Sequence, residues 1–343
     1  MTNLGAKYVQ TESVISRVLG EYVGSWESLS IQPRGSAGGF SGAQFWRIKG
    51  ADSDLCLRRW PPEHPDSDRL ALIHSTLQDA GGAGLSFLPI PHPTRNGASF
   101  VEMAGTLWEL TNWLPGQADF QQQPTDARLT NVMQAVAKFH LATTNSADTA
   151  RRSAPPPGLV ERHQILLKLL AGELASVTAA ARRVKWTELD ARIDRFLPLF
   201  WKASPAVTSL LTGAVSEHVT LQPCIRDLRS DHLLFTGDCL TGLVDFGALR
   251  IDYWAGDVAR LLGGLVPDET DRWQAALDVY HAVRPFSPND KRLIEVYDRS
   301  NVLMSPASWL RWIGVEKRRF DEPERILTIL DDWLARLELA ADG

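Results

Sequence analysis

The sequence predicts an α+β fold with a small β-rich N-terminal lobe over residues 1–114 and a larger, mostly helical C-terminal lobe over residues 115–343. Short β-type runs gather in the first third of the chain, whereas helical periodicity dominates the rest. Residues 219–246 are the exception, because they predict a small β-hairpin insertion among the helices. Strands followed by helices, without regular βαβ alternation, are typical of α+β proteins and argue against a doubly wound nucleotide fold.

The first lobe begins with a helix and continues as strands. Residues 12–24 place apolar side chains on one helical face, with Thr11 as a plausible cap. Three β-type runs and a further helix follow, over 28–31, 44–48, 55–60 and 66–80. A hairpin is predicted from 99–103 and 106–113, turning at Ala104-Gly105.

The second lobe is punctuated by polar loops and prolines. Residues 144–158 predict an exposed loop, and Asp321 with Pro323 marks the start of the last helix. The expected helices cover 125–142, 159–183, 187–202, 205–214, 255–265, 269–283, 288–303, 305–319 and 322–339.

Composition excludes several classes of protein. Lys and Arg number 36 against 41 Asp and Glu, a net charge of −5, which argues against a nucleic-acid binder that relies on phosphate neutralisation. Three cysteines without C-x-x-C spacing fit neither a disulfide framework nor a zinc site. No signal peptide is evident, and no window approaches 18 apolar residues, so we expect a cytoplasmic protein without a membrane partner.

Residues 224–247 carry the chemistry. The segment contains Ile225-Arg226-Asp227, then His232, then Asp245-Phe246-Gly247, and Asp245 follows Asp227 by 18 residues. A tight hairpin between them would bring Asp227, His232 and Asp245 together. Phosphoryl transfer needs such a set, because one carboxylate orients the attacking hydroxyl while another holds Mg²⁺ on the nucleotide phosphates.

This segment resembles the aminoglycoside phosphotransferase/choline kinase family, whose H-G-D-x-x-x-x-N…D-(W/F/L)-G pattern aligns without a gap. The resemblance implies a bilobal protein-kinase-like fold with ATP and Mg²⁺ as cofactors. It implies that Asp227 is the catalytic base, that His232 replaces the metal-binding Asn, and that Asp245 is the main Mg²⁺ ligand. Because Mg²⁺ prefers oxygen to imidazole nitrogen, Mn²⁺ is an alternative.

The same resemblance implies a nucleotide site in the small lobe. Four residues of the glycine-rich segment 34–42 are expected at the phosphates: Gly38, Gly39, Phe40 and Gly42. Arg58, preferred over Arg59, takes the place of the usual phosphate-binding Lys. The backbone near Thr111, Asn112 and Trp113 would meet the adenine edge.

One departure from the family concerns the acidic partner of the phosphate-binding residue. No acid occurs over residues 69–78, so the usual Lys–Glu pair cannot form there, and His74 is expected to be a satisfied helix histidine. Among nearby acids, Asp231 is expected as a turn residue and Asp257 as a helix cap. Asp252 either lines the substrate site or caps a turn.

The function expected is ATP-dependent transfer of the γ-phosphate to a hydroxyl of a small molecule, with an aminoglycoside-, choline- or homoserine-like acceptor. A catalytically silent, kinase-like nucleotide-binding module is the alternative, and a metal-dependent hydrolase is a third possibility. Five tryptophans in the second lobe favour core positions over a cation–π cage for a quaternary amine: Trp254, Trp273, Trp309, Trp312 and Trp333. The choice between ATP and GTP and the oligomeric state stay open.

Overall fold

The computed structural model describes residues 13–24, 30–35, 42–50, 53–144, 152–318, 320 and 322–342. Two compact units divide the chain, Met1–Ser146 with Ser230–Arg250 and Ala147–Arg229 with Ile251–Gly343. The chain thus passes between units three times, and the hairpin of the β-rich insertion belongs to the first unit. The single boundary expected after residue 114 is not among these crossings, and it stays a prediction for the nucleotide-binding lobe.

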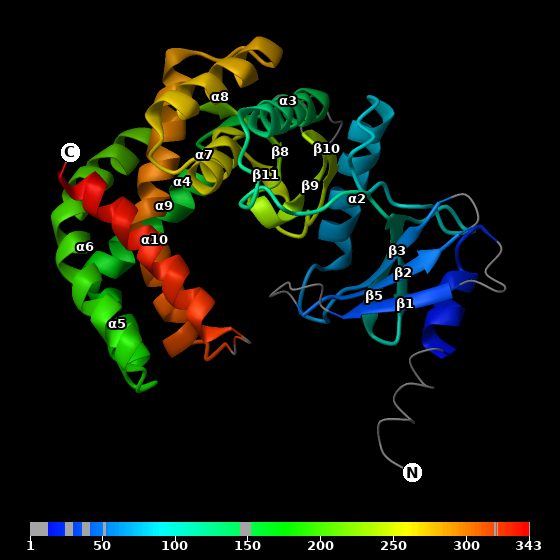
Figure 1. The fold of residues 1–343 in the computed structure, drawn as a ribbon, viewed down its shortest axis with the longest axis horizontal. Coiled ribbons are helices and arrows are strands. Elements are labelled where there is room, and N and C mark those ends of the chain that lie inside the picture. Colours follow the sequence, from blue (N-terminus) through cyan, green and yellow to red (C-terminus); the bar gives the residue numbers. More distant parts are fainter. Residues whose placement is uncertain are drawn as a thin grey trace. The chain divides into compact units, whose positions relative to one another are not determined.

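The first unit is built on a five-stranded antiparallel sheet, drawn in blue to teal in Figure 1. Its strands, in the order β1-β2-β3-β5-β4, are β1 (Ser30–Gly35), β2 (Gln44–Lys49), β3 (Leu55–Arg59), β4 (Val101–Met103) and β5 (Thr106–Asn112). Ala104 and Gly105 turn the predicted β4–β5 hairpin with φ of 54° and 71°. Two successive left-handed residues match the right-handed twist of the strands they join.

One face of this sheet is closed by the helix at residues 13–20. Of the apolar stripe expected over residues 12–24, Val18 and Tyr22 are fully buried, whereas Val23 lies beyond the end of the helix and is 68% exposed. The Tyr22 hydroxyl donates to the Trp108 carbonyl at 3.2 Å. The buried cluster comprises Ile15, Val18, Leu19, Tyr22, Trp46, Ile48, Leu57, Trp108 and Leu110. Burial of this apolar surface is what holds the helix on the sheet.

Two capped helices and a second hairpin complete the unit. Side chains of Asp66 and Thr125 accept N3 backbone N–H groups at the starts of α2 (Ser67–Gly82) and α3 (Asp126–Thr143), which satisfies otherwise unpaired donors. The hairpin pairs β9 (Leu233–Thr236) with β10 (Cys239–Leu243), after the 3-10 turn η3 (Ser230–His232). Its existence and turn confirm the sequence prediction.

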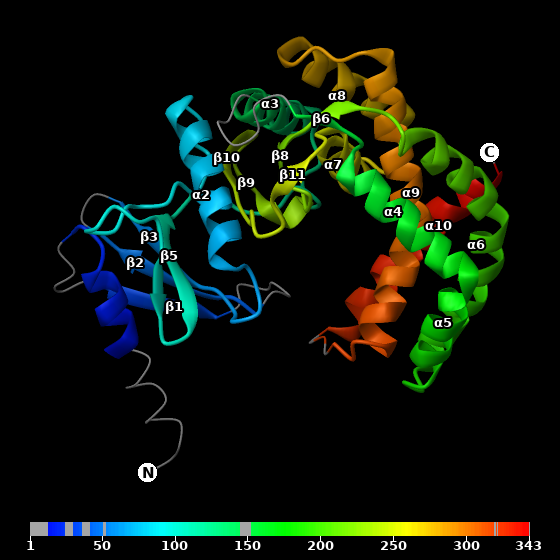
Figure 2. The ribbon, with the colours of Figure 1, turned by 180° about the vertical axis from the view of Figure 1, so that it is seen from behind.

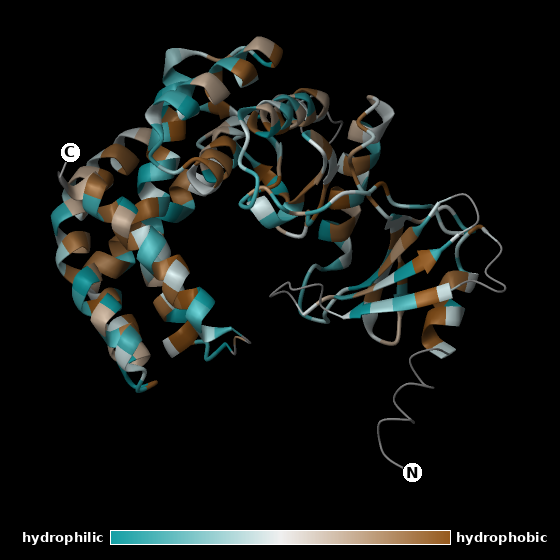
Figure 3. Ribbon diagram, viewed as in Figure 1, coloured by the Kyte–Doolittle hydropathy of each residue, from teal (hydrophilic) through white to brown (hydrophobic). Residues whose placement is uncertain are grey.

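The second unit is helical, with α6, α9 and α10 packed side by side (Figures 1 and 2). Figure 3 shows hydrophobic and hydrophilic segments alternating along these helices, as expected for helices that bury one face. Its helices are α4 (Pro157–Lys168), the π-turn η2 (Leu169–Glu173), α5 (Leu174–Arg182), α6 (Thr187–Ala214), α7 (Ala255–Leu265), α8 (Thr270–Val283), α9 (Pro288–Gly314) and α10 (Pro323–Asp342). Short ladders pair β6 (Ser153–Ala154) with β7 (Val219–Thr220), and β8 (Gln222–Cys224) with β11 (Arg250–Asp252).

Helix boundaries differ from expectation where proline or glycine lies inside a run. Single helices α6 and α9 continue through Pro205 and Pro306, although breaks were predicted just before both. A proline removes one backbone hydrogen bond, but the buried faces on either side keep these long helices continuous. Conversely, the helix predicted over 159–183 is interrupted at Gly172, whose φ is 115°.

The interrupted stretch is also the most apolar long helical segment found among the described residues. Pro157–Arg182 contains an 18-residue window of mean hydropathy 1.3, long and apolar enough to pass a test for a membrane span. In the structure 39% of that window is buried within the protein. The stretch also contains charged residues, Lys168 and Glu173 among them, so it is not a run of 18 apolar residues, and core helices meet the same criterion.

Candidate active site

Asp227 lies in the second unit, on the loop that follows β8. Backbone N–H groups of Ile225 and Arg226 donate to the Asp257 carboxylate at 2.7 and 2.6 Å, and Arg226 has a left-handed φ of 65°. Asp257 is 1% exposed. It was expected as a helix cap, but the N-cap of α7 is Trp254, and Asp257 in the first turn braces this loop instead.

The Asp227 carboxylate is oriented by a guanidinium. Arg260 of α7 donates from Nε at 3.1 Å and from Nη2 at 2.6 Å, both to Oδ1. The Nε of Arg229 lies 4.0 Å from Oδ2. Two donors that converge on one oxygen limit rotation of the carboxylate, while about a third of the side chain stays exposed.

Asp252 contacts the same loop through the Arg226 side chain. Buried to 3% exposure, it accepts the backbone N–H groups of Gly158 at 3.0 Å and Tyr253 at 2.8 Å, and lies 3.2 Å from Nε of Arg226. Burial raises its pKa, against the lowering effect of Arg226. Of its two expected roles, the contacts correspond to capping, because Gly158 lies in the first turn of α4.

In the first unit, the β9–β10 hairpin brings together His232 and Asp245, two of the three residues expected to converge; the third, Asp227, belongs to the second unit. The Nε2 of His232 lies 3.6 Å from Oδ2 of Asp245, and the Val244 N–H donates to the His232 carbonyl at 3.0 Å. Asp245 has a left-handed φ of 61°, a conformation that often marks functional positions. Burial acts to raise the pKa of Asp245, but Arg58 and His232 outweigh it and leave that pKa below its usual value.

Arg58 of β3 faces the same carboxylate. Its Nη2 lies 3.3 Å from Oδ1 of Asp245, and its guanidinium lies 3.3 Å from the centre of the Trp60 ring. Arg58 is 7% exposed, whereas Arg59 points to the opposite face of the strand and lies over Trp108. Strand alternation thus directs Arg58 toward Asp245.

Glu109 is a residue that sequence reasoning missed. It lies directly across from Arg58 in the β3–β5 register, with Oε1 3.8 Å from Nη1. Its Oε2 lies 2.7 Å from Nε2 of His74 on α2. Burial opposes ionisation of Glu109, yet the contacts with His74 and Arg58 leave its pKa below the ordinary value. The acid absent from α2 is therefore supplied by β5.

The structure describes only some of the residues expected at the nucleotide. Gly38, Gly39 and Phe40 lie outside the described residues, while Gly42 has a left-handed φ of 74°. Thr111 and Asn112 are the last two residues of β5, and Trp113 follows the strand. Thr111 is buried, and Oδ1 of Asn112 lies 2.7 Å from Nε2 of His92. The Trp113 N–H already donates to the Asp54 carbonyl at 2.9 Å, so it is not an available donor to a base in this conformation.

The donor set around Asp245 suits a metal that shares its ligands with a nucleotide. Among the described residues, no group of three or more His, Cys, Asp or Glu side chains could hold a metal alone. Mg²⁺ is usually held by one or two carboxylates, with phosphate and water oxygens completing the octahedron. Asp245 fits that role, and the His232 imidazole is a poorer ligand for the same ion.

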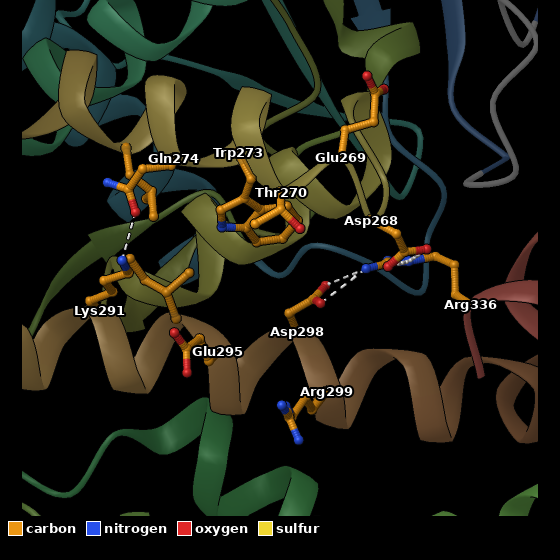
Figure 4. Close-up of a pocket in the computed structure, with 12 residues that line it drawn as sticks. Asp268, Glu269, Thr270, Trp273, Gln274, Lys291, Glu295, Asp298, Arg299 and Arg336 are labelled. Atoms are coloured by element: carbon orange, nitrogen blue, oxygen red, sulfur yellow. Dashed lines mark hydrogen bonds and ion pairs between the residues drawn. The ribbon is translucent and has the colours of Figure 1, made fainter. Parts of the chain in front are cut away.

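The second unit also contains a cavity of about 370 Å³ lined from α8, α9 and α10 (Figure 4). Two of its acids, Asp268 and Asp298, are paired with Arg336. Trp273 is among the lining residues, whereas Trp254 stacks on Tyr280 in the core. The cavity therefore lacks the set of indole faces that a cation–π cage needs, and Trp254 is a core residue, as expected.

Comparisons with known proteins identify the family and the fold. Residues 33–289 match the phosphotransferase enzyme family. A homoserine kinase of Allorhizobium ampelinum is 25% identical over 278 residues, covering 80% of this chain and 72% of that protein. Two solved structures share the fold. A microcompartment-associated aminopropanol kinase has a TM-score of 0.64 and 15% identity, covering 97% of this chain and 98% of that chain. An AMP-bound spectinomycin phosphotransferase has a TM-score of 0.63 and 11% identity, covering 91% of this chain and 92% of that chain.

The family match covers well over half of the chain, and it includes β2, β3, α2, β5, the Asp227 loop and the β9–β10 hairpin. The chain therefore belongs to the phosphotransferase enzyme family and is a small-molecule kinase with the protein-kinase-like α+β fold that its sequence predicts.

Proposed function

We propose that this kinase transfers the γ-phosphoryl group of ATP to the hydroxyl of a small acceptor, with Asp227 as the catalytic base. The observation that carries the proposal is the Asp227 carboxylate itself, held by Arg260 on a loop braced by Asp257. Asp227 accepts the hydroxyl proton as the acceptor oxygen attacks phosphorus. The new O–P bond forms, the bond between the γ-phosphorus and the β–γ bridging oxygen breaks, and ADP leaves.

The first unit supplies the nucleotide contacts in this proposal. Asp245 anchors Mg²⁺, or Mn²⁺, with His232 as a weaker ligand, and the bound ion would neutralise phosphate charge. Arg58 donates to phosphate oxygens, since a guanidinium fork suits phosphate geometry.

Backbone groups complete the proposed nucleotide site. Those of Gly38, Gly39, Phe40 and Gly42 would approach the phosphates, and those of Thr111 and Asn112 the adenine. Catalysis then consists mainly of positioning and charge stabilisation.

We infer that the acceptor is a small hydroxylated metabolite. The homoserine kinases among its relatives make homoserine the first compound to test, followed by choline, an amino alcohol and an aminoglycoside. We also propose a cytoplasmic location, where ATP is available for such a reaction.

An assay of ADP release over this acceptor panel, with Mg²⁺ or Mn²⁺, tests the proposal. Asp227→Asn should lower kcat by roughly 10²- to 10⁴-fold, the contribution of a positioned base. Asp271→Asn is the control, because this acid lies in the first turn of α8, is exposed and has no assigned role in the reaction. Nucleotide binding without turnover of any acceptor would instead favour a silent binding module.

A further inference from the structure

A continuous line of polar contacts runs through the first unit from Asp245 to helix α2. Arg58 spans two carboxylates, with Nη2 3.3 Å from Asp245 and Nη1 3.8 Å from Glu109. Glu109 continues to His74 at 2.7 Å, and Nδ1 of His74 lies 2.9 Å from the Ser99 hydroxyl. Strands β3 and β5 and helix α2 thus each contribute one member.

The three central members of this line are buried, which makes their mutual contacts obligatory. Arg58 and Glu109 are each 7% exposed and His74 is 1% exposed. A buried charge without a partner costs several kcal/mol, so Arg58 and Glu109 stabilise each other's ionised forms. A neutral imidazole can donate from Nε2 to Glu109 and accept the Ser99 hydroxyl at Nδ1, which satisfies both ring nitrogens.

The line ends at the proposed phosphate site, not in the core. The Asp245 side chain is 37% exposed. The Arg58 guanidinium that contacts it is stacked over the Trp60 and Phe45 rings. Stacking restrains the plane of the guanidinium, and Glu109 restrains its rotation within that plane. The direction of the Arg58 donors therefore depends on Glu109, and that of Glu109 depends on His74.

We infer that Glu109 and His74 are positioning residues that tether Arg58 to α2, in place of the direct Lys–Glu ion pair of kinases. The inference rests on the proposed function, because it assigns Arg58 to the phosphates. A carboxylate on the neighbouring strand meets the guanidinium, and the histidine links that carboxylate to the helix. In this arrangement the Arg58 guanidinium meets the Glu109 carboxylate through Nη1 and the Asp245 carboxylate through Nη2.

The experiment separates nucleotide binding from turnover in His74→Leu, Glu109→Gln and His74→Gln. The first two should weaken ADP affinity, measured by calorimetry, and lower kcat/KM for ATP by roughly 10- to 100-fold, the effect of misplacing a binding group by about 1 Å. The acceptor KM should stay within about twofold. His74→Gln, which keeps a donor near the Nε2 position, should recover part of the loss.

Arg59→Gln is the matched control, since Arg59 is the neighbouring arginine on the other face of β3, and it should leave every parameter unchanged. If Glu109→Gln fails to fold, the triple variant Arg58→Lys, His74→Glu, Glu109→Gln rebuilds a direct Lys–Glu pair. It should restore both folding and ADP binding.

Two results would overturn the inference. One is ADP affinity unchanged in both His74→Leu and Glu109→Gln, even where they melt earlier, because the residues would then only stabilise the fold. The other is a loss of kcat/KM that is equally large for ATP and for the acceptor. A wild-type protein that binds ADP but phosphorylates nothing would contradict the proposed function alone, since the affinity comparison needs no turnover.

Discussion

The Asp257 carboxylate accepts the backbone N–H of Arg226 at 2.6 Å, immediately before Asp227 in the chain. Its second oxygen accepts the N–H of Ile225 at 2.7 Å, so one buried anion satisfies two successive amides. Arg226 has a left-handed φ of 65°, which costs a non-glycine residue on the order of 1–3 kcal/mol. The two bonds from α7 hold this conformation and with it the direction of Asp227.

Asp257→Ala should therefore disturb the conformation of the Asp227 loop more than it disturbs the nucleotide contacts. Two buried amides lose their acceptor, which costs about 1–3 kcal/mol each in the free energy of unfolding. We expect kcat to fall by roughly 10²-fold, as reacting groups lose their alignment, while ADP affinity changes little. Asp271→Ala, in the exposed first turn of α8, is the control and should change neither. A normal kcat in folded Asp257→Ala would contradict this role.

Arg260→Lys should lower kcat more than it raises KM for either substrate. Both donors of Arg260 meet Oδ1 of Asp227, a geometry that a single ammonium reproduces poorly. Because the carboxylate keeps a positive neighbour but loses its fixed rotation, we expect roughly a 10-fold loss in kcat, milder than that of Asp227→Asn. Steady-state kinetics with both substrates varied provides the measurement, and a loss confined to the ATP KM would argue against orientation.

The lowered pKa of Glu109 should make the free energy of unfolding depend on pH. Its pKa in the folded protein lies below the ordinary value of 4.5, so the ionised form contributes stability that is present above that value. This contribution is lost as the pH falls through 4.5 toward the folded pKa. Urea unfolding at about pH 6.5 and pH 3.5 should show the gap in unfolding free energy between wild type and Glu109→Gln narrowing at the lower pH. A gap that widens on acidification would contradict the sign.

The His232–Asp245 pair could be predicted from sequence, whereas Glu109 could not, and the reason is the range of the contacts involved. A hairpin is a local structure: alternating residues and the Gly237 turn, with φ of 60°, determine its register within a few positions. The contact of Arg58 with Glu109 joins residues 51 positions apart and exists because β5 pairs with β3 while β4 is displaced to the edge. Strand order of that kind leaves no mark in either segment alone.

Asp257 and the long helices show a second limit. The first-turn position of an acid in α7 predicted a role at the helix terminus, but its partners are supplied by a loop more than 30 residues earlier. Similarly, Pro205 predicted a helix break because the lost hydrogen bond is a local cost. Packing of Phe200 and Leu211, both fully buried on either side, is a tertiary gain that local patterns do not contain.

Gly116 joins the predicted Pro-Gly turn to the hairpin that carries the metal-site residues. Its φ is 108°, and a Cβ there would lie 2.5 Å from Oγ1 of Thr241 and 2.8 Å from the Phe235 carbonyl oxygen. Gln117 next to it exchanges two backbone hydrogen bonds with Phe235, each of 2.9 Å. A side chain at this glycine would therefore push against β9 itself.

Gly116→Ala should lower the unfolding free energy by about 2 kcal/mol or more, because left-handed strain and overpacking add. Gly82→Ala is the control: this glycine ends α2 with open space around its Cβ position, and alanine there should be neutral or stabilising by about 0.5–1 kcal/mol. Since β9 begins directly after His232, folded Gly116→Ala should also need more Mg²⁺ for half-maximal activity. Equal unfolding free energies for the two variants would show that the turn yields to the new methyl group, and the coupling between this glycine and the hairpin would be disproved.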